Sequence, residues 1–138
     1  MKALSRGSAL VEFALVWPIM LLLVLGSVEL AVWASEAAAA RGAAMAGARA
    51  GTVVGANAEV ASAVAARSLS ASLIGVKVAV WCPGRATSQP PVWVCATDLG
   101  STLRVEVGGT VPSLVPLVSG MGLPLKAHAA LDKERFVR

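Results

Sequence analysis

One apolar run near the N-terminus constrains this chain more than any other feature. The twenty residues from Ala9 to Val28 contain a single charged side chain, Glu12. At about 1.5 Å per residue, a helix of this length covers roughly 30 Å, the hydrocarbon thickness of a bilayer. Much of the chain's 57% hydrophobic content lies in residues 9–34, so it indicates a membrane segment rather than a large core. We therefore predict a transmembrane helix over residues 8–34.

The charges on either side of this helix predict its direction. Lys2 and Arg6 precede it, whereas the first charges after it are Glu29 and Glu36. Positive charge favours the cytoplasmic side, so the N-terminus is expected in the cytoplasm and the chain after about Trp33 outside it. Trp33 falls where an interfacial aromatic side chain would lie. The sequence thus predicts a single-pass protein of the cytoplasmic membrane with an extracytoplasmic C-terminal part.

Glu12 needs its own explanation, because a carboxylate at the centre of a membrane helix costs roughly 2.5–3.5 kcal/mol, and less near an end. One interpretation is an interfacial side chain that reaches the headgroups. The other begins with cleavage after Gly7, which would place a new ammonium group on Ser8, one helical turn from Glu12. Such a pair would neutralise both charges in a medium of low dielectric. Gly7, which has no side chain, suits an endopeptidase that must bring the backbone into its site.

The residues around this position resemble the N-terminus of a known family. The segment Arg6–Leu15, followed by Pro18 and a leucine-rich run to Gly26, resembles that of TadE-like proteins, the pseudopilins of the tight-adherence (Flp) type IV pilus system. The strong part of the resemblance covers about residues 5–34. It implies a minor pseudopilin that acts in the assembly or initiation of a pilus, with other pilins or pseudopilins, the pilus assembly machinery and membrane lipid as partners.

The resemblance also implies roles for four residues. A prepilin peptidase would cut between Gly7 and Ser8 on the cytoplasmic side, which makes residues 1–7 a cytoplasmic leader. Glu12 and Phe13 then occupy the fifth and sixth positions of the mature chain, where the family has a glutamate followed by an aromatic residue.

Two alternatives remain open from the sequence. The first is an uncleaved, membrane-anchored binding or scaffold protein with its domain outside the cytoplasm. The second is a small secreted domain released by signal peptidase within Ala37–Ala40. The apolar run is about 25 residues long, however, against roughly 7–15 for the apolar region of a signal peptide.

Residues 35–75 are expected to form an extracytoplasmic helical region of small residues. Ala39, Ala43, Gly47 and Gly51 recur every four residues and make one row along the helix. Such rows let helices approach closely, but alanine-rich stretches are also simply good helix formers, and both interpretations stay open. Residues 52–55 break the pattern and predict a hinge, after which Asn57 is expected to cap a second helix that runs to about Ile74.

Beyond Gly75 the hydrophobic period changes to two, which predicts strands. The segments concerned are Val76–Val80, Thr102–Val107 and Leu125–Leu131, with Val92–Cys95 as a short fourth. Gly108-Gly109 predicts a turn or bulge, and residues 111–119 a loop or single helical turn. The expected fold class is α+β: a transmembrane helix extended into a long alanine-rich helix, followed over residues 76–138 by a small antiparallel sheet of three or four strands.

The two cysteines suggest a staple for this small domain. Cys82 and Cys95 each end a predicted strand, and a disulfide is permitted outside the cytoplasm. The sequence lacks the Cys-x-x-Cys pair of a redox site, and a zinc site needs about four ligands. We favour a structural disulfide between Cys82 and Cys95 over two free thiols.

No catalytic constellation can be assembled from the remaining residues. The single histidine, His128, falls on the polar side of an apparent edge strand, and Asp98, Glu106, Asp132 and Glu134 read as surface charges. There is no glycine-rich phosphate loop and no nucleophile paired with a base. The net charge of +4 includes no basic block interleaved with aromatics, so nucleic-acid binding has no support. We expect no catalytic residue, metal or cofactor, and a chain that is the substrate of an enzyme rather than an enzyme.

Overall fold

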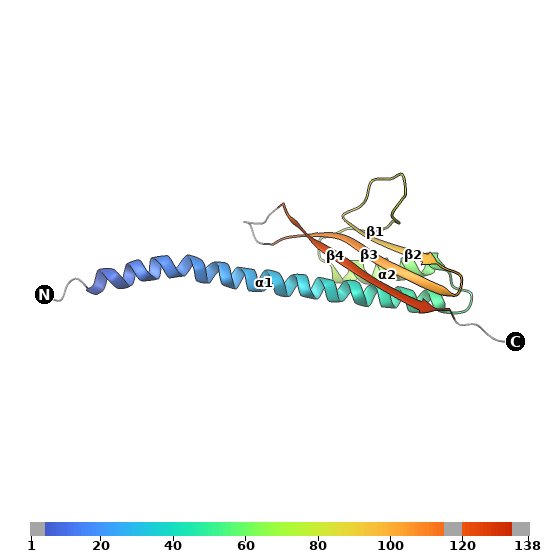
Figure 1. The fold of residues 1–138 in the computed structure, drawn as a ribbon, viewed down its shortest axis with the longest axis horizontal. Helices are drawn as coiled ribbons and strands as arrows, with labels where there is room; N and C mark the ends of the chain where they lie inside the picture. The colour runs from blue at the N-terminus through green and yellow to red at the C-terminus, as the bar shows by residue number, and fades with distance from the viewer. Residues whose placement is uncertain (1–4, 115–119, 134–138) are drawn as a thin grey trace.

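The computed structural model describes residues 5–114 and 120–133, with two helices followed by four strands (Figure 1). In chain order the elements are α1 (Ser5–Thr52), α2 (Ala58–Ser72), β1 (Val78–Val80), β2 (Val92–Asp98), β3 (Thr102–Pro112) and β4 (Gly122–Asp132). This is the predicted α+β class, with the long apolar helix first and a small sheet after it. All four predicted strands are present; β2, β3 and β4 run longer than their patterns indicated, and β1 is shorter.

Helix α1 has two halves with different surroundings. Its N-terminal half projects alone from the folded domain, while its C-terminal half lies against the sheet (Figure 1). The large apolar side chains from Leu10 to Leu30 stand exposed. A helix that is hydrophobic on every side needs an apolar environment on every side. Within the described residues, α1 is the one helix long and apolar enough to cross a membrane, with a mean hydropathy of 2.3 over its most apolar window.

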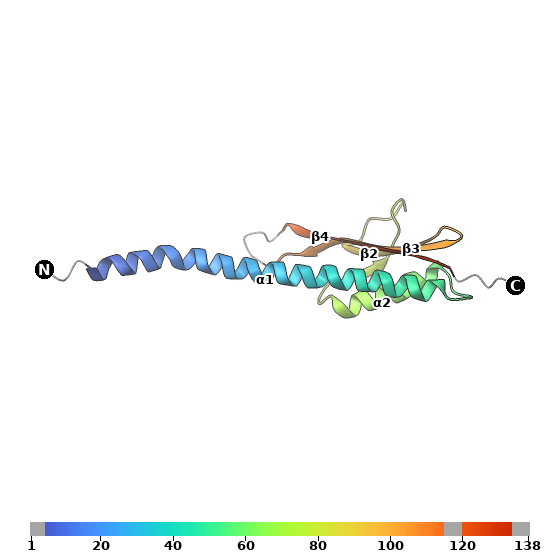
Figure 2. The same ribbon diagram turned by 60° about the horizontal axis from the view of Figure 1, so that its bottom comes forward.

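The folded domain has two layers, a sheet on one side and two helices on the other (Figure 2). The strand order is β1-β2-β3-β4. The C-terminal half of α1 lies beneath β3 and β4, and α2 lies beneath β1 and β2. Small residues on the helices let the sheet approach closely, and aliphatic residues fill the space from the sheet side. The buried core consists of Ala40, Ala43, Ala44, Ala48, Ala61, Ala65, Leu69, Leu73, Val92, Val94, Leu103, Val105, Val107, Val111, Leu125 and Ala129.

The connection between the helices follows the predicted pattern. Helix α1 ends at Thr52, and the Asn57 side chain accepts a hydrogen bond of 3.0 Å from the backbone N–H of Val60. This contact satisfies one of the unpaired donors at the start of α2, as expected of an N-cap. Helix α2 then runs back along α1, and the cap prediction is confirmed.

The sheet is mixed, which corrects the antiparallel prediction in one detail. Strand β1 pairs with β2 in parallel, with Val78 opposite Val92 and Val80 opposite Val94. The other two pairs are antiparallel. Residues 81–91 do not make a hairpin turn but return the chain to the end of the sheet at which β1 began. A parallel pair needs a connection of this kind.

The glycine pair at positions 108 and 109 lies inside β3, so the prediction of a turn or bulge there was wrong. Trp93 of β2 is directly opposite Gly108, and Val92 is opposite Gly109. The indole of Trp93 covers Gly108 so closely that a Cβ atom there would overlap the ring, and Gly109 adopts a φ of 138° that favours glycine. The glycines therefore make room for an aromatic side chain on the neighbouring strand. Val111 and Pro112 complete β3, and residues 115–119 of the predicted loop lie outside the described residues.

Candidate functional site

The residues of the predicted processing motif lie at the start of α1. Gly7 and Ser8 fall within its first turns, so the bond between them has helical backbone conformation. Glu12 and Phe13 follow one turn later, and both side chains are exposed. The Phe13 ring stacks on that of Trp17, with 5.7 Å between the ring centroids. This end of the helix presents a carboxylate and an aromatic pair on an otherwise aliphatic surface.

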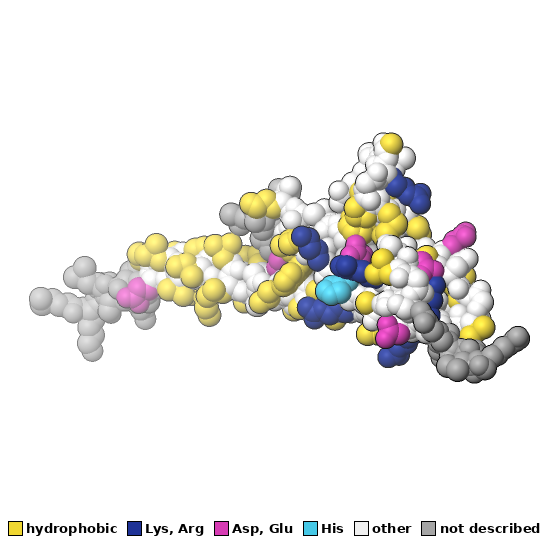
Figure 3. Space-filling view, turned by 45° about the vertical axis from the view of Figure 1, so that its right-hand side comes forward, with side chains coloured by type: hydrophobic (Ala, Val, Ile, Leu, Met, Phe, Trp, Pro, Cys, Tyr) yellow, Lys and Arg dark blue, Asp and Glu magenta, His cyan; other side chains and the backbone are white. Residues whose placement is uncertain are grey.

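Beyond the motif, hydrophobic side chains cover the free half of α1 (Figure 3). None of the side chains in its most apolar window is buried within the molecule. An apolar surface of this extent does not remain in water in a stable protein. The geometry therefore agrees with the predicted membrane helix, and α1 is a candidate membrane span.

The side chains of two α1 residues attach the sheet to the helix through hydrogen bonds where the apolar surface ends. The Glu29 carboxylate accepts hydrogen bonds of 2.9 and 3.2 Å from the backbone N–H of Leu114, just beyond the end of β3. The Trp33 indole donates a hydrogen bond of 3.2 Å to the backbone oxygen of Pro124 in β4. Trp33 is half-buried and packs against the core. The sequence predicted Trp33 to lie at the membrane interface. The structure adds a hydrogen bond from its indole to β4, which the sequence did not reveal.

Glu36 lies two turns beyond Glu29 on α1 and is half-buried. Burial raises the pKa of its carboxyl group, and the nearby Glu29 carboxylate raises the pKa further. Both effects disfavour the charged form.

The row of small residues on α1 packs within this chain. A Cβ atom on Gly47 would lie 2.6 Å from the backbone oxygen of Ala61 and 2.7 Å from the Cβ of Ala65 in α2. A Cβ atom on Gly51 would likewise overlap Ala61 of α2 and Leu103 of β3. Ala43 is buried in the core. Ala39, at the other end of the row, is half-buried. Gly47 and Gly51 let α2 approach α1, so these two positions are occupied by intramolecular contacts.

Cys82 and Cys95 form a disulfide in the structure, with 4.8 Å between their Cα atoms. The parallel pairing explains why they meet: Val80 lies beside Val94, so Cys82, two residues past the end of β1, comes close to Cys95 within β2. The bridge closes the excursion of residues 83–94. Beside it, the rings of Trp81 and Trp93 make an edge-to-face contact with 5.6 Å between their centroids.

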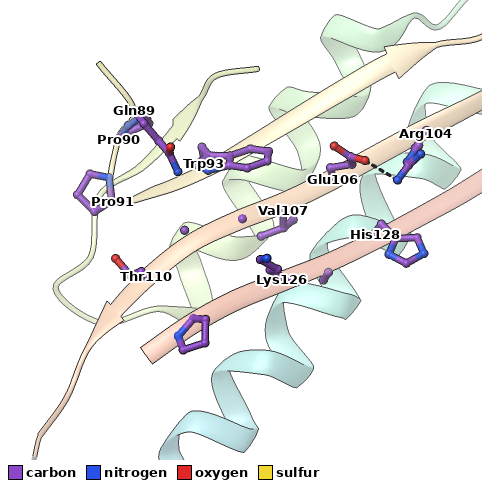
Figure 4. Close-up of a pocket in the computed structure, with 14 residues that line it drawn as sticks. Gln89, Pro90, Pro91, Trp93, Arg104, Glu106, Val107, Thr110, Lys126 and His128 are labelled. Atoms are coloured by element: carbon purple, nitrogen blue, oxygen red, sulfur yellow. Dashed lines mark ion pairs between the residues drawn. The ribbon is translucent and has the colours of Figure 1, made fainter. Parts of the chain in front are cut away.

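The outer face of the sheet holds a groove of about 760 Å³ that the sequence reading did not identify (Figure 4). The Trp93 ring lies along one side, and Lys126 and His128 of β4 line the other. Arg104 and Glu106, successive outward residues of β3, form an ion pair of 2.6 Å at one end. These residues alternate with core residues on three adjacent strands. The alternation could have identified these residues as facing outward. Which of them lie side by side depends on the register of the strands, which the sequence does not give.

His128 is exposed on β4, which is an edge strand, as predicted. Across the described residues, no group of three or more His, Cys, Asp or Glu side chains is placed to hold a metal ion. Asp98 and Asp132 also lie on the exposed surface, Asp98 paired with Lys133 and Asp132 accepting a hydrogen bond from Thr102. Glu134 lies outside the described residues.

These features define a class of protein: a small α+β domain built onto the extension of an N-terminal helix that is a candidate membrane span. Residues 7–49 match the family described as TadE-like protein, which confirms the resemblance seen in the sequence over that segment. The matched segment begins at Gly7, includes the whole apolar run and ends before the sheet. It indicates a protein associated with the Tad pilus. Comparisons with curated proteins and with solved structures found no match.

Proposed function

We propose that this chain is a minor pseudopilin of a tight-adherence pilus, cut after Gly7 by a prepilin peptidase and active in pilus assembly or initiation. The observation that supports this most directly is the segment Arg6–Phe13 at the head of a long apolar helix, where the family match also begins. The mature protein is anchored in the cytoplasmic membrane by residues 8–34. Its sheet domain lies on the extracytoplasmic side.

Cleavage requires the peptidase to open the first turns of α1, because the Gly7–Ser8 bond is helical and an endopeptidase must reach the backbone on both sides of the bond. Gly7 lowers the cost of this opening, since a glycine in a helix is less favourable than alanine by about 1 kcal/mol. The new ammonium group on Ser8 then lies one turn from Glu12. The pair removes two unfavourable charges from the apolar medium, either within one chain or between neighbouring subunits.

The proposed partners are the prepilin peptidase, other pilins or pseudopilins, the pilus assembly machinery and membrane lipid. None of these roles requires catalysis by this chain. The sheet domain supplies surface for contacts outside the membrane, and α1 supplies a long apolar surface that can exchange lipid for neighbouring helices.

Release as a secreted domain fits the structure less well. Ala37–Ala40 belong to the uninterrupted helix α1, and Ala40 is fully buried in the core. A cut there would also detach Glu29 and Trp33, which hold the sheet. The uncleaved anchored protein remains the main alternative, and it predicts an intact Gly7–Ser8 bond.

The deciding experiment is mass spectrometry of the N-terminus of the protein recovered from membranes of its native host. We expect a mature chain that begins at Ser8. A chain that begins at Met1 in cells with an active peptidase would contradict the proposal, and a start near Ala38 would indicate a secreted domain. Gly7→Val should block processing and leave the slower-migrating precursor.

Glu12→Ala separates the proposed pairing from simple anchoring. Removing a charge makes the helix more apolar, so membrane insertion should be at least as complete as in the wild type. Piliation should be lost, because the Ser8 ammonium has no partner. Normal piliation by this variant would argue against the pairing.

A further inference from the structure

The groove on the outer face of the sheet has no part in the proposed function. Its volume of about 760 Å³ falls within the range of roughly 300–1,000 Å³ that is typical of small-molecule sites. All the residues that line it belong to the described part of the chain. It lies on the side of the sheet away from α1 and α2 (Figure 2), so neither helix covers it.

Trp93 supplies a fixed aromatic surface along one side of the groove. It is directly opposite Gly108 of β3, where a Cβ atom would overlap the indole, so the glycine lets the ring rest against the strand. Trp81 contacts the Trp93 ring but does not line the groove, and its own indole N–H donates a hydrogen bond of 3.0 Å to Thr87. The ring is therefore held by contacts outside the groove, and a ligand that stacks on it has little side-chain ordering to induce.

The strand register arranges polar side chains around this ring. Lys126 of β4 is also opposite Gly108, so its backbone lies two strands, or about 10 Å, from that of Trp93. The next outward row, about 7 Å along the strands, has Glu106 opposite His128. A space wide enough for one sugar ring thus has an indole on one side, an ammonium group on the other and a carboxylate toward one end (Figure 4).

The charges in the lining favour an anionic ligand. Arg104 is paired with Glu106, whereas Lys126 has no ion pair with any described side chain. Two cations against one carboxylate leave an excess of one positive charge, with His128 counted as neutral. A ligand carboxylate near Lys126 would form a charge-assisted hydrogen bond, which is stronger than a bond between neutral groups.

The floor of the groove favours a saccharide over a peptide. Strand β3 is paired with β2 over Leu103–Gly109 and with β4 over its whole length, so its backbone offers no partners to the main chain of an extended peptide. Recognition therefore depends on side chains. An aromatic face suits the apolar C–H face of a sugar ring, and the lining holds both a carboxylate acceptor and cationic donors for the sugar hydroxyls.

We propose that this groove binds an acidic saccharide. A sugar ring stacks on Trp93, a carboxylate of the glycan pairs with Lys126, and Glu106 accepts a hydrogen bond from a hydroxyl group. The proposal goes beyond the proposed function and depends neither on cleavage after Gly7 nor on a role in pilus assembly.

The test measures binding of short uronate oligomers to the full-length chain in detergent micelles. The probes are the tetramers of galacturonate, glucuronate and mannuronate, with maltotetraose as the neutral control and tetraglutamate as the acidic peptide. Saturation-transfer NMR gives the Kd and identifies the ligand protons that contact the protein. Lys126→Gln removes the proposed charge partner, and Lys77→Gln is the matched control at an exposed position outside the groove. Trp93→Leu removes the aromatic face, and circular dichroism confirms that each variant is folded.

We expect at least one uronate tetramer to bind, with the strongest transfer to its ring C–H protons. Lys126→Gln should raise the Kd by about tenfold or more, the effect of losing one charge-assisted hydrogen bond, and Lys77→Gln should leave it unchanged. Trp93→Leu should weaken the transfer to the ring protons.

Three results would overturn the inference. The first is that none of the uronates binds at millimolar concentration. The second is that maltotetraose binds as tightly as the uronates, or that Lys126→Gln and Lys77→Gln have equal effects. The third is that tetraglutamate binds more tightly than every uronate, which would identify a peptide site. The proposed function survives each of these results, because it is tested by the start of the mature chain.

Discussion

The backbone N–H of Leu114 donates hydrogen bonds to both carboxylate oxygens of Glu29, across 85 positions of sequence. The contact joins the chain just beyond the end of β3 to α1, where the apolar run of the helix ends. Together with the bond from Trp33 to Pro124, it holds the folded domain along the helix, next to the end of the apolar run. Glu29, the acidic residue just after the apolar run, therefore has a structural role in holding the sheet on α1.

Removing this acceptor should loosen the end of β3 selectively. Glu29→Ala leaves the Leu114 N–H without its partner, at a cost of about 1 kcal/mol for an exposed hydrogen bond. Hydrogen exchange at Leu114 should become about fivefold faster, while amides in the centre of β3 keep their rates. Glu29→Gln retains an acceptor oxygen and is the matched control. Equal exchange at Leu114 in the wild type and Glu29→Ala would show that the contact does not protect the end of β3.

Gly47→Ala and Gly42→Ala compare two glycines on the same helix. A methyl group on Gly47 would collide with Ala61 and Ala65, whereas Gly42 has nothing within 4 Å of the same position. Gly47→Ala should lower the free energy of unfolding by about 1–3 kcal/mol through overpacking. Gly42→Ala should raise it by up to about 1 kcal/mol through helix propensity. Chemical denaturation in detergent, followed by tryptophan fluorescence, measures both, and equal effects of the two variants would contradict the close packing of α1 on α2.

Breaking the disulfide should destabilise the sheet domain. Cys82 and Cys95 are 13 residues apart, and closing a loop of this size is worth about 3 kcal/mol in the chain-entropy model. The variant with both Cys82→Ala and Cys95→Ala should lose about that free energy of unfolding. A thiol reductant should destabilise the wild type similarly and leave the double variant unchanged. If the wild type is insensitive to reduction under conditions shown to open the bridge, the disulfide contributes no stability.

Glu36 should make stability depend on pH. Burial, with a further contribution from Glu29, raises the pKa of the Glu36 carboxyl in the folded protein. The folded state therefore binds the proton more tightly than the unfolded state, so protonation of Glu36 stabilises the fold. This stabilisation is fully present below the unfolded pKa of about 4.3. It is lost as the pH rises through the higher folded pKa.

Glu36→Gln isolates this contribution because it keeps the shape of the side chain and removes its charge. At pH 7 the variant should have a higher melting temperature than the wild type, and the difference should vanish below about pH 4. Thermal melts of the two proteins across this range give the comparison. A difference that grows toward low pH would reverse the predicted sign.

Patterns that depend on neighbours in the chain were readable without the structure. The length of the apolar run predicts a membrane helix because a helix rises by a constant amount per residue. Asn57 predicts a cap because its side chain acts on a backbone group three residues away. Alternation predicts strands because successive side chains on a strand point to opposite faces. Of the candidate site, the segment around Gly7 and Glu12 was recognisable for the same reason.

The tertiary structure decided how those elements meet. Alternation is the same in parallel and antiparallel strands, so the orientation of β1 depends on the path of residues 81–91. The partners of Glu29 and Trp33, the cover of Trp93 over Gly108, and the packing of Gly47 on α2 all join residues far apart in sequence. Sequence alone determined the local elements because their forces act within a few residues, whereas contacts between elements depend on the packing of the whole domain.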